Sequence, residues 1–367
     1  MVIKMILKKA GLTAAIILGF SGAAMAETET LNVYNWWDYI NPEIVKSFET
    51  ETGIKVNYDV YDSNEALEAK LMAGNSGYDI VVPSGSFLER QAKAGIYSEI
   101  DRSELPNYKN LDPTLLKTAE ISDPGNAYGV PYAWGTIGLG YNEDLLKERL
   151  GDRPFNSFDL LFDENISSKL QDCGIALLDS PSEVMAITLN YLGLDPNSED
   201  KDDLEKGMQL LKKVRKNIKY FNSGTLVQDL VNGDICLALG YNGDLLRAQQ
   251  RAVEAGIKAK LKYVIPVEGS VAWFDLIAIP ADAKNKTAAH KFINYLLQPE
   301  NAAGISNFVM YAVPNTQVAP FLEDSIRTNP GIYPGDEIKA KLFSQKAHSA
   351  KFDRRLTSAW TSIKTGR

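Results

Sequence analysis

The residues best suited to chemistry in this chain are acids that stand among aromatic side chains. Residues 35–39, Asn-Trp-Trp-Asp-Tyr, place three aromatics around Asp38 at the end of an apolar segment. In the stretch 271–280, Trp273 and Asp275 share one face of a predicted strand, because alternate residues of a strand point the same way. Aromatic faces attract cations, and an acid in so apolar a strand is costly to bury unless it is paired. Both stretches favour a site for an organic cation.

Two further acids have local explanations that need no ligand. Residues 180–183 (SPSE) fit a helix capping box with proline at the first helical position, which accounts for Glu183. Residues 242–244 (NGD) are an ordinary turn and helix start, which accounts for Asp244. At residues 242–244, only the neighbouring Tyr241, at the end of an apolar strand, indicates a binding site.

Other interpretations of these acids stay open at this point. Asp38 could cap the helix that follows it, and Asp275 could pair with a lysine or arginine of another lobe. Aromatics with two carboxylates also suit a sugar that is hydrolysed between them, so a glycosidase remains an alternative.

The elements that must position these residues alternate between strands and helices. Predicted strands cover 31–36, 54–61, 78–83, 174–178, 235–240 and 272–279. Predicted helices cover 42–52, 64–73, 86–94, 181–192, 204–214, a segment from 243, and 286–297. This alternation predicts an α/β fold of two lobes with parallel βαβ units and helices on both faces of the sheet. Ligands of such sheets bind beyond the carboxyl ends of the strands, so we expect the site in the cleft between the lobes.

Composition excludes several classes of function. The chain has 367 residues, 45% of them hydrophobic, which is enough for more than one core. Its net charge of -8 has the wrong sign for a protein that binds a phosphate backbone. With two histidines and two cysteines, no zinc cluster and no histidine beside a nucleophile is indicated. We therefore expect no metal, no cofactor, no nucleic acid partner and no catalytic residues.

The first residues have the layout of a cleavable export signal. Lys4, Lys8 and Lys9 precede an apolar run at 10–20, and Ala24-Met25-Ala26 provides a cleavage site. The mature protein is expected to begin at Glu27, and no later segment approaches the roughly 20 apolar residues of a spanning helix. No cysteine follows the predicted cleavage site, so we expect a periplasmic protein without a lipid anchor.

Cys173 and Cys236 are the two cysteines of the chain. An even count in an oxidising compartment favours one disulfide, with two separate buried thiols as the alternative.

These same residues carry a resemblance that covers essentially the whole mature chain. The matching stretches are YNW at 34–36, DY at 38–39, ETGIKV at 51–56, DSNE at 62–65, KLMAG at 70–74, VVPS at 81–84, NGDIC at 232–236, PADAKNK at 280–286 and NPGIYP at 329–334. On these stretches the chain resembles the periplasmic polyamine-binding proteins of ABC importers, and among them the putrescine-binding type.

The resemblance implies a two-lobed periplasmic binding protein of type II, with a hinge and a ligand cleft between the lobes. The implied segments are a signal peptide at 1–26, lobe 1 at 27–135 and 272–330, lobe 2 at 136–271, and a C-terminal helical segment at 331–367 that packs on the lobes. Its implied ligand contacts are Trp36, Asp38, Tyr39, Ser84, Glu183, Tyr241, Asp244, Trp273, Asp275 and Tyr311, with Trp37 as a further candidate. It also implies a Cys173–Cys236 disulfide, a monomer, and delivery of the ligand to an inner-membrane permease. Ligand contact and helix capping can coexist at Glu183.

Three positions depart from the putrescine-binding pattern. Trp37 stands where a serine is usual, and Tyr241 stands where a tryptophan is common. Trp273 stands where that type has phenylalanine and spermidine-preferring members have tryptophan, whereas Asp244 matches the putrescine type. We predict spermidine narrowly over putrescine because of Trp273, while Trp37 could fill space that a ligand needs. A polyamine sensor, or a binder of agmatine or norspermidine, is the alternative within the binding class.

Overall fold

The computed structural model describes residues 29–61 and 63–366, and the predicted signal at 1–26 lies outside them. Within these described residues, nine strands form one sheet in the order β2-β1-β3-β9-β4-β7-β5-β6, with β8 beside β4. The strands are β1 (Thr30–Trp36), β2 (Lys55–Tyr61), β3 (Ile80–Val81), β4 (Gly129–Asn142), β5 (Ile175–Leu177), β6 (Tyr220–Phe221), β7 (Leu237–Tyr241), β8 (Leu261–Val264) and β9 (Ala272–Ala278).

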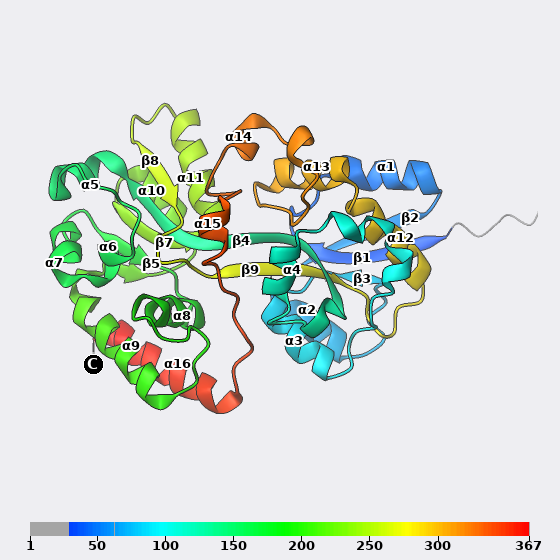
Figure 1. The fold of residues 1–367 in the computed structure, drawn as a ribbon, viewed down its shortest axis with the longest axis horizontal. Coiled ribbons are helices and arrows are strands. Elements are labelled where there is room, and N and C mark those ends of the chain that lie inside the picture. The colour runs from blue at the N-terminus through cyan, green and yellow to red at the C-terminus, as the bar shows by residue number, and fades with distance from the viewer. Residues whose placement is uncertain (1–28, 62, 367) are drawn as a thin grey trace, which may run out of the picture.

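Helices surround this sheet (Figure 1). The helices of the first half are α1 (Pro42–Thr52), α2 (Asn64–Met72), α3 (Gly85–Lys93), α4 (Pro113–Ala119), α5 (Glu143–Leu150), α6 (Asp159–Phe162), α7 (Glu164–Ser167) and α8 (Pro181–Tyr191). Those of the second half are α9 (Lys201–Val214), α10 (Leu226–Asn232), α11 (Asn242–Glu254), α12 (Lys286–Leu296), α13 (Pro299–Val309), α14 (Asp324–Arg327), α15 (Asp336–Lys339) and α16 (Ala350–Thr365). In α1 the Asn41 side chain accepts a hydrogen bond from the Glu43 amide, so Asn41, and not Asp38, caps this helix.

The expectation of parallel βαβ units is correct for the two ends of the sheet and wrong for its centre. β1 pairs in parallel with β2 and β3, and β5 pairs in parallel with β6 and β7. β9 and β4 pair antiparallel with each other and with their other neighbours, so the sheet is mixed. β4 was not predicted from the sequence, because four glycines and a proline interrupt its apolar pattern.

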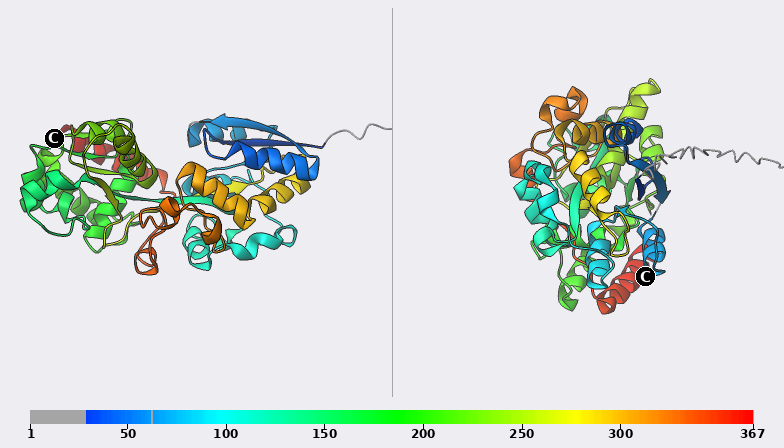
Figure 2. Two further views of the ribbon diagram at one scale, coloured as in Figure 1. Left: turned by 90° about the horizontal axis from the view of Figure 1, so that it is seen from above. Right: turned by 90° about the vertical axis from the view of Figure 1, so that its right-hand side faces the viewer.

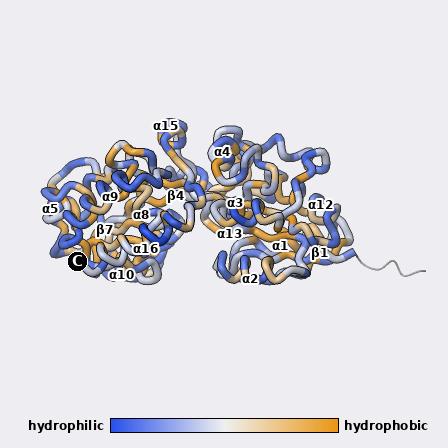
Figure 3. Tube along the Cα trace, turned by 90° about the horizontal axis from the view of Figure 1, so that it is seen from below, coloured by the Kyte–Doolittle hydropathy of each residue, from blue (hydrophilic) through white to orange (hydrophobic). Residues whose placement is uncertain are grey.

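In the described part of the chain, two separate hydrophobic clusters form between the strands of this sheet and the helices around it, and they define the two lobes. The cluster of lobe 1 is built around Phe48, Leu67, Trp134 and Phe292. The cluster of lobe 2 is built around Ile137, Phe158, Leu189 and Leu237, and it includes Phe352, Leu356, Trp360 and Ile363 of the C-terminal α16. Figure 2 shows the two bodies separated by a narrow waist, and Figure 3 shows hydrophobic positions inside both.

Among the described residues, β4, the start of β9 and the loop between α15 and α16 pass through this waist. β4 pairs with β9 over Gly129–Thr136 in lobe 1 and with β7 and β8 over Ile137–Asn142 in lobe 2. The chain between α15 and α16 crosses as well, where Phe343 pairs with Val271. Figure 1 shows these crossings at the centre of the molecule. A hinge at this waist lets the lobes move relative to each other without unfolding either core.

A disulfide joins Cys173, just before β5, to Cys236, just before β7, which confirms the predicted pairing. It closes a loop whose ends are 63 residues apart in the sequence. Replacing both cysteines by serine is expected to lower the free energy of unfolding by about 4 kcal/mol, because the unfolded chain regains the entropy of that loop. Urea unfolding followed by far-ultraviolet circular dichroism measures this change. Wild-type protein in reductant should then match the double variant, and equal midpoints for oxidised wild type and variant would contradict the prediction.

In the described part of the chain, no helix combines the length and the apolar character needed to cross a membrane.

Candidate functional site

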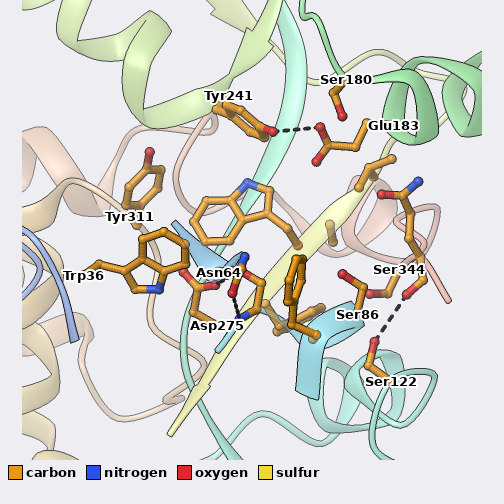
Figure 4. Close-up of a pocket in the computed structure, with 18 of the residues that line it drawn as sticks. Trp36, Asn64, Ser86, Ser122, Ser180, Glu183, Tyr241, Asp275, Tyr311 and Ser344 are labelled. Atoms are coloured by element: carbon orange, nitrogen blue, oxygen red, sulfur yellow. Dashed lines mark hydrogen bonds between the residues drawn. The ribbon is translucent and has the colours of Figure 1, made fainter. Parts of the chain in front are cut away.

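A cleft of about 710 Å³ lies between the lobes at the waist. Lobe 1 contributes the turn after β1, the starts of α2 and α3, strand β9 and the segment after α13. Lobe 2 contributes the start of α8, the end of β7 and part of α11. The site therefore lies at the carboxyl ends of β1 and β7, as predicted from the alternation of strands and helices in the sequence. In Figure 4, Trp36, Tyr311, Tyr241, Glu183 and Asp275 lie around the cleft, and a further indole side chain lies between them.

Asp275 is the most buried carboxylate of the cleft, with 6% of its surface exposed. Its Oδ2 accepts a hydrogen bond from the Tyr39 hydroxyl at 2.7 Å, and its Oδ1 accepts one from the Ser84 hydroxyl at 2.6 Å. Burial raises the pKa of Asp275 to about 6, against the opposing effect of these two hydrogen bonds. Among the described residues no lysine, arginine or histidine forms an ion pair with it, so the alternative that Asp275 pairs with a lysine or arginine of another lobe is wrong.

Glu183 faces the cleft from the first turn of α8 in lobe 2. The hydroxyl of Tyr241, at the end of β7, donates a hydrogen bond to Glu183 Oε2 at 2.7 Å. Burial raises the pKa of Glu183, and the hydrogen bonds from Ser180 and Tyr241 oppose that rise. The Ser180 side chain makes no capping hydrogen bond to the helix backbone, so the interpretation of residues 180–183 as a capping box is wrong.

Aromatic rings wall the cleft between these two acids. Trp273 and Tyr311 meet edge to face with ring centres 4.9 Å apart, and Tyr39 lies 6.2 Å from Tyr311. The Trp36 indole nitrogen donates to the Val82 carbonyl at 2.9 Å, which fixes the ring at the end of β1. Such pairs are held by complementary edges and faces. These rings form a rigid box whose faces can pack on alkyl chains and attract cations.

Two glycines make room for this box. A side chain at Gly135 of β4 would collide with the Trp273 indole, and one at Gly243 of α11 would collide with the Tyr311 ring. The backbone therefore lies directly against both rings and limits their movement.

Trp37 and Asp38 form the rim of the cleft. Asp38 has a left-handed backbone with φ of 56°, which turns the chain sharply after β1. The turn leaves 72% of Trp37 exposed while Trp36 stays partly buried. Trp37 therefore lines the cleft at its rim and does not fill it. Asp38 lines the cleft as an exposed carboxylate.

Of the residues predicted from the sequence, the structure brings ten together and leaves one outside. Those that line the cleft are Trp36, Trp37, Asp38, Tyr39, Ser84, Glu183, Tyr241, Trp273, Asp275 and Tyr311. Asp244 lies outside this lining, although its charge raises the pKa of both Tyr241 and Tyr311.

Several residues that line the cleft were not predicted from the sequence. Asn64, Glu65, Ser86 and Phe87 occupy helix starts that follow strands, a position the strand–helix alternation could have flagged. Arg247 lies in the middle of α11, and Ser344 and Gln345 lie on the loop between α15 and α16. No sequence pattern distinguishes these last three from ordinary surface residues.

The arrangement suits an extended organic cation with a charged group toward each acid. Of the two acids described above, Asp275 lies in lobe 1 and Glu183 in lobe 2, with the aromatic box between them. Carboxylates without a protein cation bind ammonium groups through charge-assisted hydrogen bonds, which are about twice as strong as neutral ones.

Comparison with known proteins agrees with this geometry. Residues 43–334 match the family model of bacterial extracellular solute-binding proteins. The putrescine-binding periplasmic protein PotF of Escherichia coli is 50% identical over 97% of both chains. The putrescine-binding periplasmic protein SpuD of Pseudomonas aeruginosa is 48% identical over 96% of this chain and 97% of that one. The structure of the spermidine/putrescine substrate-binding protein PotD of Streptococcus pneumoniae has a TM-score of 0.83 at 30% identity, covering 92% of this chain and 99% of that one.

The fold and the cleft define a two-lobed solute-binding protein of bacterial transport, not an enzyme. Within that class the chain belongs to the family of periplasmic polyamine-binding proteins of ABC importers.

Proposed function

We propose that this protein captures one linear polyamine in the periplasm and delivers it to an inner-membrane ABC permease, acting as a monomer. The observation that carries the proposal is the pair Asp275 and Glu183, which face one aromatic box from opposite lobes. The methylene groups of the ligand pack between Trp36, Tyr241 and Trp273. Its ammonium groups bind Asp275 and Glu183, with Asp38 at the rim.

Ligand binding also explains how the permease recognises a loaded protein. A ligand that contacts both lobes favours the closed state by its difference in affinity for the two states. The lobes we propose are 27–135 with 272–330, and 136–271, and the segment 331–367 spans them. The permease then docks on the closed shape.

The identity of the polyamine is the finer part of this proposal. Trp273 supports spermidine, as predicted from the sequence. The relatives named as putrescine-binding, at 50% and 48% identity, support putrescine. Titration calorimetry of the refolded, ligand-free protein with putrescine, spermidine, spermine and agmatine in one buffer separates these cases. Micromolar or tighter binding of at least one polyamine supports the proposal, and the absence of binding by all four refutes it.

Trp37 offers a direct test of how the cleft closes. Its exposed indole at the rim is expected to cover the bound cation when the lobes close. Replacing Trp37 by Ser should weaken polyamine binding about two- to fivefold, since an exposed cation–π contact is worth roughly 0.5 to 1 kcal/mol. Calorimetry measures the change. Val253→Ser removes another exposed apolar side chain, on α11 outside the cleft, and should leave affinity unchanged. Tighter binding by the Trp37→Ser variant would show that the ring obstructs the ligand.

A further inference from the structure

Arg247 is the one basic side chain among the described residues that line the cleft. It lies on α11 of lobe 2, where it is exposed. Across the described residues its guanidinium forms no hydrogen bond and no ion pair with any acid, although acids dominate the same cavity. The acids of that lining are Asp38, Glu65, Glu183 and Asp275. A protein that binds cations thus keeps one cation of its own in the site.

The positive charge of Arg247 acts electrostatically on Tyr311, which lines the cleft, and on Asp244. The guanidinium opposes the rise in pKa that burial causes at Asp244, and it does the same at Tyr311. Arg251, one turn further along α11, also acts on Asp244 but does not line the cleft. Asp244 therefore lies outside the cavity and within the field of two protein cations, although burial still raises its pKa. It is poorly placed to receive another ammonium group.

We propose that Arg247 is a specificity-determining residue, a resident cation that occupies the position of a third ligand charge and so favours polyamines with two ammonium groups over those with three. This inference rests on the proposed function and names the ligand class within it. A diamine such as putrescine places its two charges at Asp275 and Glu183. A triamine such as spermidine must bring its third ammonium toward a region where a like charge already stands, and like charges repel.

The proposed role of Arg247 is independent of the aromatic box. Trp273 sets the width of the slot for the methylene chain, whereas Arg247 sets how many charges the slot accepts. The two residues lie on different lobes, Trp273 on β9 and Arg247 on α11. Their effects can therefore be separated by substitution.

The test compares the ratio of spermidine and putrescine dissociation constants in wild type and three variants by titration calorimetry. Arg247→Gln is expected to improve spermidine binding about tenfold while changing putrescine binding less than threefold. Arg247→Lys keeps the charge and should keep the wild-type ratio. Arg251→Gln removes the same charge from the same helix outside the cavity and should also keep it.

The outcomes distinguish this inference from the proposed function. An unchanged ratio in Arg247→Gln, in a protein that binds polyamines, overturns the role of Arg247 alone. An equal shift in Arg251→Gln also overturns it, because the effect would then be one of overall charge. If wild type prefers 4-aminobutyrate to putrescine and Arg247→Gln loses that preference, Arg247 binds a ligand carboxylate and the inference is wrong. If wild type binds no polyamine, the proposed function and this inference fall together.

Discussion

Replacing Asp275 by Asn is expected to weaken polyamine binding at least 100-fold and, at the same time, to stabilise the ligand-free protein. The carboxylate forms no ion pair with a protein cation among the described residues, so in the proposed complex an ammonium group of the ligand would be its only charged partner. Truncating one partner of a buried, hydrogen-bonded charge pair typically costs about 2 to 5 kcal/mol of binding free energy. Calorimetry with the preferred polyamine measures the loss.

The gain in stability follows from the sign of the pKa shift. The pKa of Asp275 rises from 3.8 to about 6 on folding, so the folded protein binds this proton more tightly than the unfolded chain does. The stabilisation from protonation is complete below pH 3.8 and is lost as the pH rises through 6. At pH 8 the ionised group therefore destabilises the fold by on the order of 3 kcal/mol. Asparagine, which is neutral, should raise the melting temperature of the ligand-free protein by several degrees at pH 8 and by much less at pH 4.

A matched control is available in the same lobe. Asp123 is also buried and has a raised pKa, but it does not line the cleft. Its Oδ2 accepts hydrogen bonds from the amides of Tyr128 and Gly129. Asp123→Asn should leave polyamine affinity unchanged. If Asp275→Asn retains wild-type affinity, Asp275 is not a ligand contact and the proposed site is wrong.

The sequence predicted the parts of the site that have a regular period. Alternation along one strand placed Trp273 and Asp275 on the same face, and both line the cleft. It also placed Trp36 at the end of a strand, where the structure has it. Local motifs can be read this way because strand geometry fixes them within a few residues.

The parts that the sequence did not reveal depend on contacts between distant segments. Glu183 reads as a helix cap, and only the approach of Tyr241 from β7 shows that it belongs to the cleft. The partners of Asp275 lie 236 and 191 residues away in the chain, at Tyr39 and Ser84. β4 was not predicted because its glycines are required by side chains and backbone of distant segments that pack closely against this strand. Such contacts leave no local pattern in the sequence.

Acidification is expected to weaken polyamine binding about tenfold or more between pH 7.5 and pH 5. Asp275 must be ionised to bind an ammonium group, and its pKa of about 6 in the ligand-free protein lies inside this range. Below that pKa protons compete with the ligand, and each carboxylate that titrates contributes up to a factor of ten per pH unit. Glu183, whose pKa is also raised by burial, adds to the effect. The ligand's own amines stay protonated throughout, so the change belongs to the protein.

Calorimetry in two buffers of different ionisation enthalpy tests this mechanism directly. At pH 5.5 ligand binding should release protons, because the bound ammonium lowers the pKa of Asp275, and at pH 8 the release should vanish. In Asp275→Asn the pH dependence should become shallower and retain only the contribution of Glu183. An affinity that is constant from pH 5 to pH 8 would show that neither buried acid contacts the ligand charge. Protonation of Asp275 stabilises the ligand-free fold and opposes ligand binding. At acid pH the ligand-free protein should therefore be more stable with respect to this group than at pH 8, where ionised Asp275 destabilises the fold. The increase in melting temperature caused by the ligand should become smaller over the same pH range.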